Sequence, residues 1–284
     1  MTSSFPFEPI KKSHAVGELV VYFEVLDKLF STKSEAQKAK EVITPFFSRA
    51  DDSPSVEINL DINGATTEQR RDGFTFIKFR DGTQEMSWVL RMSGNHLSLH
   101  SIDYTRWDAI FPQIIDYLTT AFSVIERPLN FSSIGIKVID RFRFVGATPE
   151  DYKLGVLLDP NSKYISQHAF SAGQRWHVNT GWFEKSPAGD ETEELLHQLN
   201  ADSSMFVGAE GKNEALVSID HSATLGNINR MGGIPLRRFS NKDQHFFSSL
   251  RDSLQFLHEK NKQIVFDLLN KEVASKINLV VEQS

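Results

Sequence analysis

The chain has 284 residues, a net charge of −6 at pH 7 and no cysteine. The lack of cysteine excludes disulfides, cysteine-ligated zinc, iron–sulfur clusters and thiol catalysis. The acidic balance argues against an overall electrostatic attraction to nucleic acid or to anionic lipid.

Hydrophobic residues make up 40% of the chain and charged residues 24%, which is typical of globular proteins, so we expect the whole chain to fold. The first residues carry no basic segment followed by an apolar run. No stretch approaches the roughly 18–20 apolar residues that are needed to span a bilayer. We therefore expect a cytoplasmic protein that has no membrane partner.

The first half of the chain predicts the order strand, helix, four strands, helix. β-Branched and aromatic residues without helical spacing predict a strand over 16–25, and apolar residues three and four apart predict a helix over 34–47. Four strands of alternating or β-branched composition are expected next, at 56–62, 74–79, 86–92 and 96–102. Three turn-forming pairs are expected to separate these antiparallel strands: Asp72-Gly73, Asp81-Gly82 and Gly94-Asn95.

A long helix is expected to start at Thr105. The Thr105 hydroxyl and Asp108 have the spacing of a capping box, in which each side chain satisfies a backbone amide of the first turn. Apolar residues keep the helical period as far as Ile125. Pro128 is expected to end the helical region.

The second half repeats this outline with looser spacing. Its expected strands are 133–144, 175–183 and 216–225. A short helix is expected over 149–158, and the acidic stretch 186–200 is expected to be a solvated loop or a short helix. A last helix of about six turns is expected to start at Ser240, which again has capping-box spacing to Asp243.

These patterns predict an α+β fold of two modules, 1–128 and 129–284. In each module we expect an antiparallel sheet with a long helix across one face. The shared order of elements suggests an internal duplication and resembles the TATA-binding-protein topology. Because one fold shape hosts unrelated functions, this resemblance carries no implication for DNA binding.

Four short segments of the sequence carry a resemblance to other proteins: Tyr104-Thr-Arg-Trp107, Gly135-Ile-Lys-Val-Ile-Asp-Arg141, Val217-Ser-Ile-Asp220, and Leu257-His258 with Phe266. Together these segments resemble a sporadically distributed family of uncharacterised bacterial proteins, and the resemblance extends over nearly the full length of the chain. The family pattern in the second segment is Gly-Leu-Arg-Tyr-Ile-Asn-Arg, so that Lys137 and Asp140 replace its Arg and Asn. The resemblance implies a bacterial protein and a toxin–antitoxin or phage-defence setting, and it implies no mechanism.

The sequence contains none of the standard phosphate-loop, dinucleotide-binding, zinc-protease or nucleophile-elbow motifs. The segment 231–235, Met-Gly-Gly-Ile-Pro, lies between Arg230 and the pair Arg237 and Arg238. Adjacent glycines can bring backbone amides close to an anion that the three arginines would neutralise. A connector before the last helix explains the same residues, and we prefer that interpretation.

A polar, partly basic face is expected on the second sheet, because alternate residues of a strand point the same way. The candidate binding residues on it are Lys137, Arg141, Arg143, His177, Asn179 and Asp220. Such a face suits nucleic acid, an acidic peptide or a small anion. Pairing of the cations with nearby acids would instead make it an ordinary solvated surface.

The sequence Asp220-His221-Ser222 suggests a hydrolase, but on a strand His221 points away from both neighbours. We therefore expect His221 to be a hydrogen-bonded core residue. His96 and His100 are about 13 Å apart on one strand, too far to share a metal, and are expected at the surface. Neither a metal nor a cofactor is expected.

The last helix is apolar on nearly all sides, with Phe247, Phe256 and Phe266 lying beyond its core stripe. Packing within the chain and docking of a protein partner or a second copy at this C-terminal helix region both explain that composition. Three functions stay open: a non-catalytic binding or regulatory protein, a nucleic-acid binder, and a metal-independent hydrolase or nuclease. The missing catalytic motifs favour the first.

Overall fold

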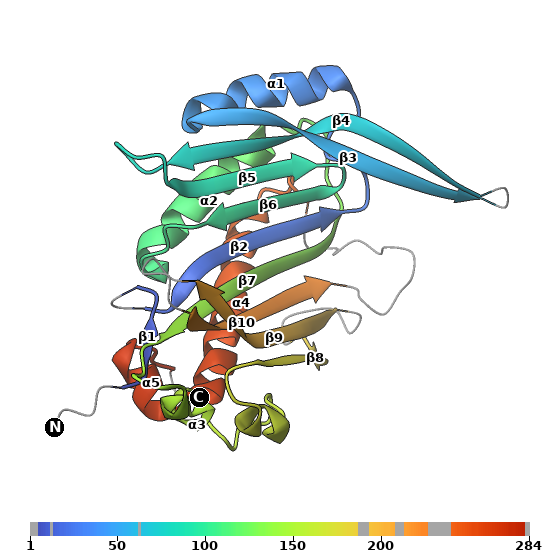
Figure 1. The fold of residues 1–284 in the computed structure, drawn as a ribbon. Helices are drawn as coiled ribbons and strands as arrows, with labels where there is room; N and C mark the ends of the chain where they lie inside the picture. The colour runs from blue at the N-terminus through green and yellow to red at the C-terminus, as the bar shows by residue number, and fades with distance from the viewer. Residues whose placement is uncertain are drawn as a thin grey trace. The chain divides into compact units, whose positions relative to one another are not determined.

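The computed structural model describes residues 5–11, 14–61, 64–186, 193–207, 213–226 and 240–281 (Figure 1). The strands are β1 (Phe7–Pro9), β2 (Val16–Val25), β3 (Arg49–Asp61), β4 (Gly64–Phe79), β5 (Met86–Ser93), β6 (His96–Ser101), β7 (Phe131–Phe144), β8 (Trp176–Lys185), β9 (Glu194–Val207) and β10 (Asn213–Gly226). The helices are α1 (Lys33–Ile43), α2 (Trp107–Ser123), α3 (Leu154–Leu157), α4 (Phe246–Leu268) and α5 (Lys271–Lys276), with 3₁₀ turns η1 (Thr44–Phe46), η2 (Pro149–Asp151) and η3 (Gln167–Ser171). This combination confirms the α+β class.

The chain forms two compact units, each assembled from several segments. Unit 1 contains Met1–Leu19, Ile136–Thr224 and Leu254–Ser284, and unit 2 contains Val20–Gly135 and Leu225–Ser253. The strand order is β3-β4-β5-β6-β2-β7-β10-β9-β8, with β1 beside β7. Because the unit boundaries fall within β2 and β7, both strands contribute residues to each unit.

In unit 2, strands β3 to β6 form an antiparallel meander. Strand β5 pairs with β4 only from Phe74 onward, so the earlier part of the β3–β4 hairpin extends beyond its neighbours (Figure 1). The core of the unit is aromatic, with ring centroids 5.2 to 5.9 Å apart among Phe23, Phe122, Phe131 and Phe246. Such pairs add roughly 0.5–1.5 kcal/mol each beyond the burial of their area.

In unit 1, strands β7, β10, β9 and β8 form the sheet, and α4 supplies most of the helical cover. Ile264, Val265 and Leu268 of α4 are buried in one cluster with sheet residues that include Val217 and Leu199. Packing within the chain therefore accounts for the apolar stripe of the last helix.

Two of the three predicted turns are confirmed. Gly82 and Gly94 have φ angles of 72° and 59°, which non-glycine residues rarely adopt. The turn at Asp72-Gly73 is wrong, because β4 runs through it. A Cβ on Gly73 would overlap Ser93 of β5, so the glycine permits close strand approach. The side chains of 54–72, including the alternating 56–62, lie outside the described part.

The expected cap of the middle helix is wrong. Helix α2 starts at Trp107, its N-cap is Arg106, and no side chain of that residue bonds to the first turn. Thr105 and Asp108 therefore form no capping box. The predicted helix over 149–158 is likewise interrupted, because only η2 and the one-turn α3 are helical there.

The predicted start of the last helix at Ser240 is also wrong, because α4 begins at Phe246. Asn241 provides the reason. Its Nδ2 donates to the carbonyls of Ile125 and Arg127, and its Oδ1 accepts from the N–H of Leu129. This segment is tied to the chain that follows α2, so it does not wind into the helix.

The prediction of a loop or short helix over 186–200 is wrong, because β9 begins at Glu194. In β9 the residues Leu195, His197, Leu199 and Ala201 are buried and their neighbours are more exposed. This is the alternation of a strand, which the nearby acidic residues and the buried histidine obscured.

Strands 16–25, 133–144, 175–183 and 216–225 are confirmed with small shifts at their ends. The module boundary near residue 128 and the duplication stay predictions. Among the helices that the structure describes, none has both the length and the apolar composition required to cross a bilayer.

Candidate functional site

The predicted basic face exists in unit 1, but most of its charge is compensated. Lys137 Nζ lies 2.6 Å from Asp220 Oδ2, and Arg143 Nε lies 3.5 Å from Glu214 Oε2. Along an antiparallel ladder one residue number rises as that of its partner falls, so paired residues keep a constant sum. Both ion pairs have the same sum, which agrees with one register between the two strands. Arg141 has no ion-pair partner among the described residues. The face is therefore a row of paired charges with one additional arginine.

His177 and Asn179 point to solvent from β8, as predicted. Asp202 of β9 lies opposite His177 in the ladder. Burial raises the pKa of the Asp202 carboxyl and nearby Asp220 adds to the rise, whereas His177 and Arg141 oppose it. Arg230, Arg237 and Arg238 with the segment 231–235 lie outside the described residues.

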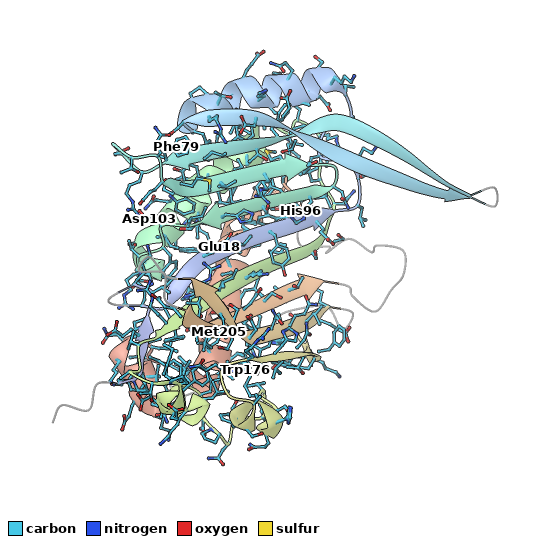
Figure 2. The ribbon with its side chains drawn as sticks, in the orientation of Figure 1. Glu18, Phe79, His96, Asp103, Trp176 and Met205 are labelled. Atoms are coloured by element: carbon cyan, nitrogen blue, oxygen red, sulfur yellow. The ribbon has the colours of Figure 1, made fainter. Side chains whose placement is uncertain are left out.

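Strand β8 is the last strand of the sheet, and no described strand pairs with its outer edge. It pairs with β9 without a register shift over all ten residues, from Trp176 (Figure 2) to Lys185. The N–H of Ser186 donates to the C=O of Glu193. Bonded pairs alternate in an antiparallel ladder, so the even-numbered residues of β8 bond to β9.

The odd-numbered residues of β8 direct their backbone groups away from the sheet. These are His177, Asn179, Gly181, Phe183 and Lys185. No described residue makes a hydrogen bond to their N–H or C=O groups. Phe183 adds an apolar group beside this edge, since 53% of it is exposed.

The opposite edge strand, β3, differs in ways that discourage pairing. Its register shifts between Ser53 and Ser55, at Pro54, and its charged residues include Asp51 and Asp52. Proline, bulges and charges are the devices by which edge strands resist association. Strand β8 has no proline and no bulge, so its edge is the one suited to accept another strand.

The inner face of β8 rests on a stack of four rings. Tyr164 stacks on Trp182 at 4.9 Å, Trp182 on His197 at 4.8 Å, and His197 on His221 at 5.3 Å. Neither imidazole has exposed surface. The prediction that His221 is a hydrogen-bonded core residue is confirmed.

The hydrogen bonds along this stack assign the tautomers. Asn261 Nδ2 donates to His221 Nδ1 at 2.9 Å, which places the proton of His221 on Nε2. That N–H donates to His197 Nδ1 at 3.1 Å, so His197 carries its proton on Nε2. His197 Nε2 is 3.6 Å from Glu184 Oε1, and Lys260 Nζ donates to Glu184 Oε2 at 2.7 Å.

The pKa values agree with neutral imidazoles above an ionised carboxylate. Burial, with repulsion from His197, lowers the pKa of His221 to about 3. Burial also lowers the pKa of His197, against the opposing effect of Glu184. Burial raises the pKa of Glu184, but the bond from Lys260 and the other polar contacts outweigh it, so the net shift is downward. The 3.6 Å contact is therefore a polar contact, not an ion pair.

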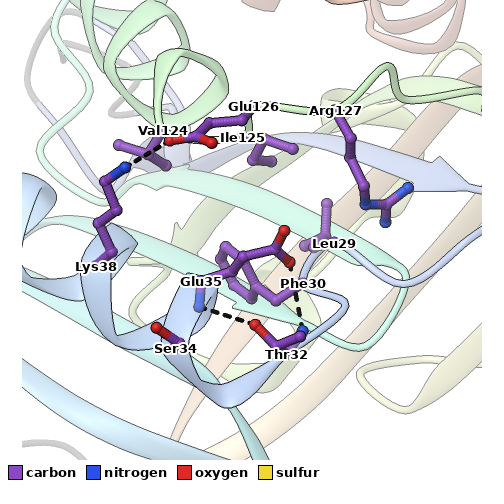
Figure 3. A pocket seen from close by; sticks show the side chains of 10 residues that line it. All are labelled: Leu29, Phe30, Thr32, Ser34, Glu35, Lys38, Val124, Ile125, Glu126 and Arg127. Atoms are coloured by element: carbon purple, nitrogen blue, oxygen red, sulfur yellow. Dashed lines mark hydrogen bonds and ion pairs between the residues drawn. The ribbon is translucent and has the colours of Figure 1, made fainter.

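Two pockets lie elsewhere. In unit 2 a pocket of about 220 Å³ lies between the start of α1 and the chain after α2, where Lys38 faces Glu126 and Glu35 caps the helix (Figure 3). In unit 1 a pocket of about 290 Å³ opens beside Tyr164, with Asp267 and Lys271 in its lining. Both linings balance acids against bases, and neither gathers a reactive group.

No family model, curated protein or solved structure matches the chain. The family resemblance therefore stays a prediction. Sequence reasoning placed His177, Asn179 and His221 on their correct faces, but it did not identify the stack of Trp182 on His197 or the role of Glu184. The missing signal was the alternation within β9, which would have placed His197 inside the sheet.

Proposed function

We propose that the chain is a non-catalytic binding or regulatory protein that accepts an extended strand at the outer edge of β8. The observation that supports this most strongly is the uninterrupted ten-residue edge, whose outward backbone groups have no described partner. Strand addition is a recurring mode of protein recognition, in which main-chain bonds supply affinity and side chains supply specificity.

The energetics favour such an edge as a recognition element. A hydrogen bond contributes roughly 0.5–1.5 kcal/mol net, so a row of them along one strand supports binding without a deep pocket. The aromatic stack and the bond from Lys260 to Glu184 hold the inner face of β8 in place. A strand that is already rigid loses less conformational entropy when it binds.

The other two functions have less support. A phosphate backbone needs unpaired cations, whereas Lys137 and Arg143 lie against carboxylates. A hydrolase needs an accessible base, whereas His221 is fully buried and Asp220 is bonded to Lys137.

The proposed partner surface differs from the C-terminal helix region that composition suggested. In that region the core stripe of α4 is buried in the chain, and Phe247, Phe256 and Phe266 beyond the stripe are half-buried. The bacterial, cytoplasmic setting and the duplicated, TATA-binding-protein-like architecture are further proposals, and they rest on the sequence patterns alone.

Comparison of Asn179→Pro with Asn179→Ala tests the function. Proline removes an outward N–H that no described residue uses, whereas alanine keeps it. We expect affinity-tagged wild type and Asn179→Ala to co-purify from the native host with one stoichiometric protein, either a host protein or the untagged chain, and Asn179→Pro to lose it. Equal melting temperatures of the two variants would show that folding is intact. Retention of that protein by folded Asn179→Pro would contradict the proposal.

A further inference from the structure

The outward edge of β8 is self-complementary when a second copy approaches it antiparallel. With the two-fold axis at Gly181, that glycine lies opposite its own copy, Asn179 lies opposite Phe183, and His177 lies opposite Lys185. All five outward residues then face outward residues, so the two strands exchange ten backbone hydrogen bonds. A typical protein interface carries about ten direct hydrogen bonds.

The antiparallel register also brings opposite charges of the two copies close together on the outer face of the sheet. Neither Lys185 nor Asp202 forms an ion pair with a described residue, and Asp202 is only partly compensated in its own chain, by the electrostatic effects of His177 and Arg141. In the antiparallel arrangement Lys185 lies beside His177 of the second copy, whose ladder neighbour is Asp202. An ammonium group on a long side chain can reach that carboxylate. The two-fold axis makes this contact twice.

A contact between Lys185 and Asp202 within one chain is not possible. Lys185 pairs with Glu194, and Asp202 pairs with His177, so eight ladder positions separate the two residues. At about 3.3 Å per residue they lie roughly 26 Å apart. Any energetic coupling between them must therefore arise across two chains.

We propose that the strand added to β8 is β8 of a second copy of this chain, which makes the protein a two-fold symmetric dimer. This inference rests on the proposed function and names its partner. In the dimer the second copy covers the exposed Phe183, and its Lys185 adds to the partial compensation that His177 and Arg141 give Asp202 in the single chain.

Sedimentation equilibrium of the purified full chain at low salt tests the proposal. We expect a dimer for wild type and for Asn179→Ala, and a monomer for Asn179→Pro. We expect Lys185→Glu and Asp202→Lys each to raise the dimer dissociation constant about tenfold, because each replaces two attractions by two repulsions. The double variant restores dimerisation, since the exchanged charges again match.

The outcomes separate this inference from the proposed function. A wild-type monomer whose host partner is still lost in Asn179→Pro would overturn the dimer and leave strand addition intact. A dimer that persists in folded Asn179→Pro would place the dimer interface elsewhere and overturn this inference, and it would overturn strand addition as well if that variant also keeps its co-purifying protein. Additive effects of the two charge reversals would overturn the antiparallel register.

Discussion

Asp140 lies in β7 between Val138 and Phe142, with 5% of its surface exposed. It has no hydrogen bond or ion pair among the described residues. Burial raises the pKa of the carboxyl from 3.8 to about 7. Because the pKa in the folded state exceeds that in the unfolded state, protonation of Asp140 favours the folded state. This contribution to stability is fully present below pH 3.8 and is lost as the pH rises through about 7.

Replacement Asp140→Asn should therefore stabilise the protein at alkaline pH. The amide keeps the shape and stays neutral, so at pH 8 we expect a gain of up to about 4 kcal/mol, which corresponds to a shift of about three pKa units. At pH 4 the two proteins should have similar stability. Urea unfolding at both pH values measures this, with exposed Asp116→Asn as control. An equal effect of Asp140→Asn at both pH values would contradict the assignment.

At the scale of elements, the packing of β2 on β7 limits the size of the side chain at position 135. The Tyr22 ring of β2 packs directly on Gly135 of β7, so that a Cβ at this position would overlap the ring. Tyr22 also stacks on His96 of β6 at 6.4 Å. Gly135 therefore leaves the space that the outer end of the Tyr22 ring occupies.

Gly135→Ala should destabilise the protein by about 1–3 kcal/mol, because it overpacks this contact. In a Tyr22→Ala background the same substitution should cost much less, since the ring is gone. A double-mutant cycle of unfolding free energies measures the coupling. Equal costs in both backgrounds would mean that the overlap with Tyr22 is not the cause.

At the scale of the whole molecule, histidines whose pKa is lowered by burial shape the response to acid. Burial lowers the pKa of His221 and of His258 to about 3, and it also lowers the pKa values of His197 and His96. The unfolded chain binds these protons near pH 6.5, whereas the folded chain resists them. Between about pH 3 and 6.5 the unfolded state therefore holds more protons, and stability rises with pH.

Each such histidine makes the unfolding free energy rise by about 1.4 kcal/mol per pH unit in this range. Asp140 has the opposite effect, because the folded state holds its proton more tightly than the unfolded state does. We expect unfolding free energies to increase from pH 4.5 to 6.5 and to level off or fall slightly above pH 7. Urea titrations at several pH values measure the slope. His258→Leu should lower the slope of the unfolding free energy by the contribution of one proton, about 1.4 kcal/mol per pH unit. A flat profile between pH 4.5 and 6.5 would contradict the buried neutral histidines.

The sequence alone determined the α+β class, most strands and the opposite faces of Asp220 and His221. These features depend on local periodicity, which side-chain burial imposes within a single strand or helix. It failed where contacts distant in the sequence override local signals. Asn241 delays α4 by bonding to the chain after α2, and the Gly73 turn signal reflects close contact with Ser93.

Only the tertiary structure decided which strand is an edge and which cations are paired. The carboxylates that bind Lys137 and Arg143 come from β10, more than 70 residues away, and the ladder with β9 determines which amides of β8 face outward. Such relations depend on strand order and register, which long-range pairing sets and local composition does not encode.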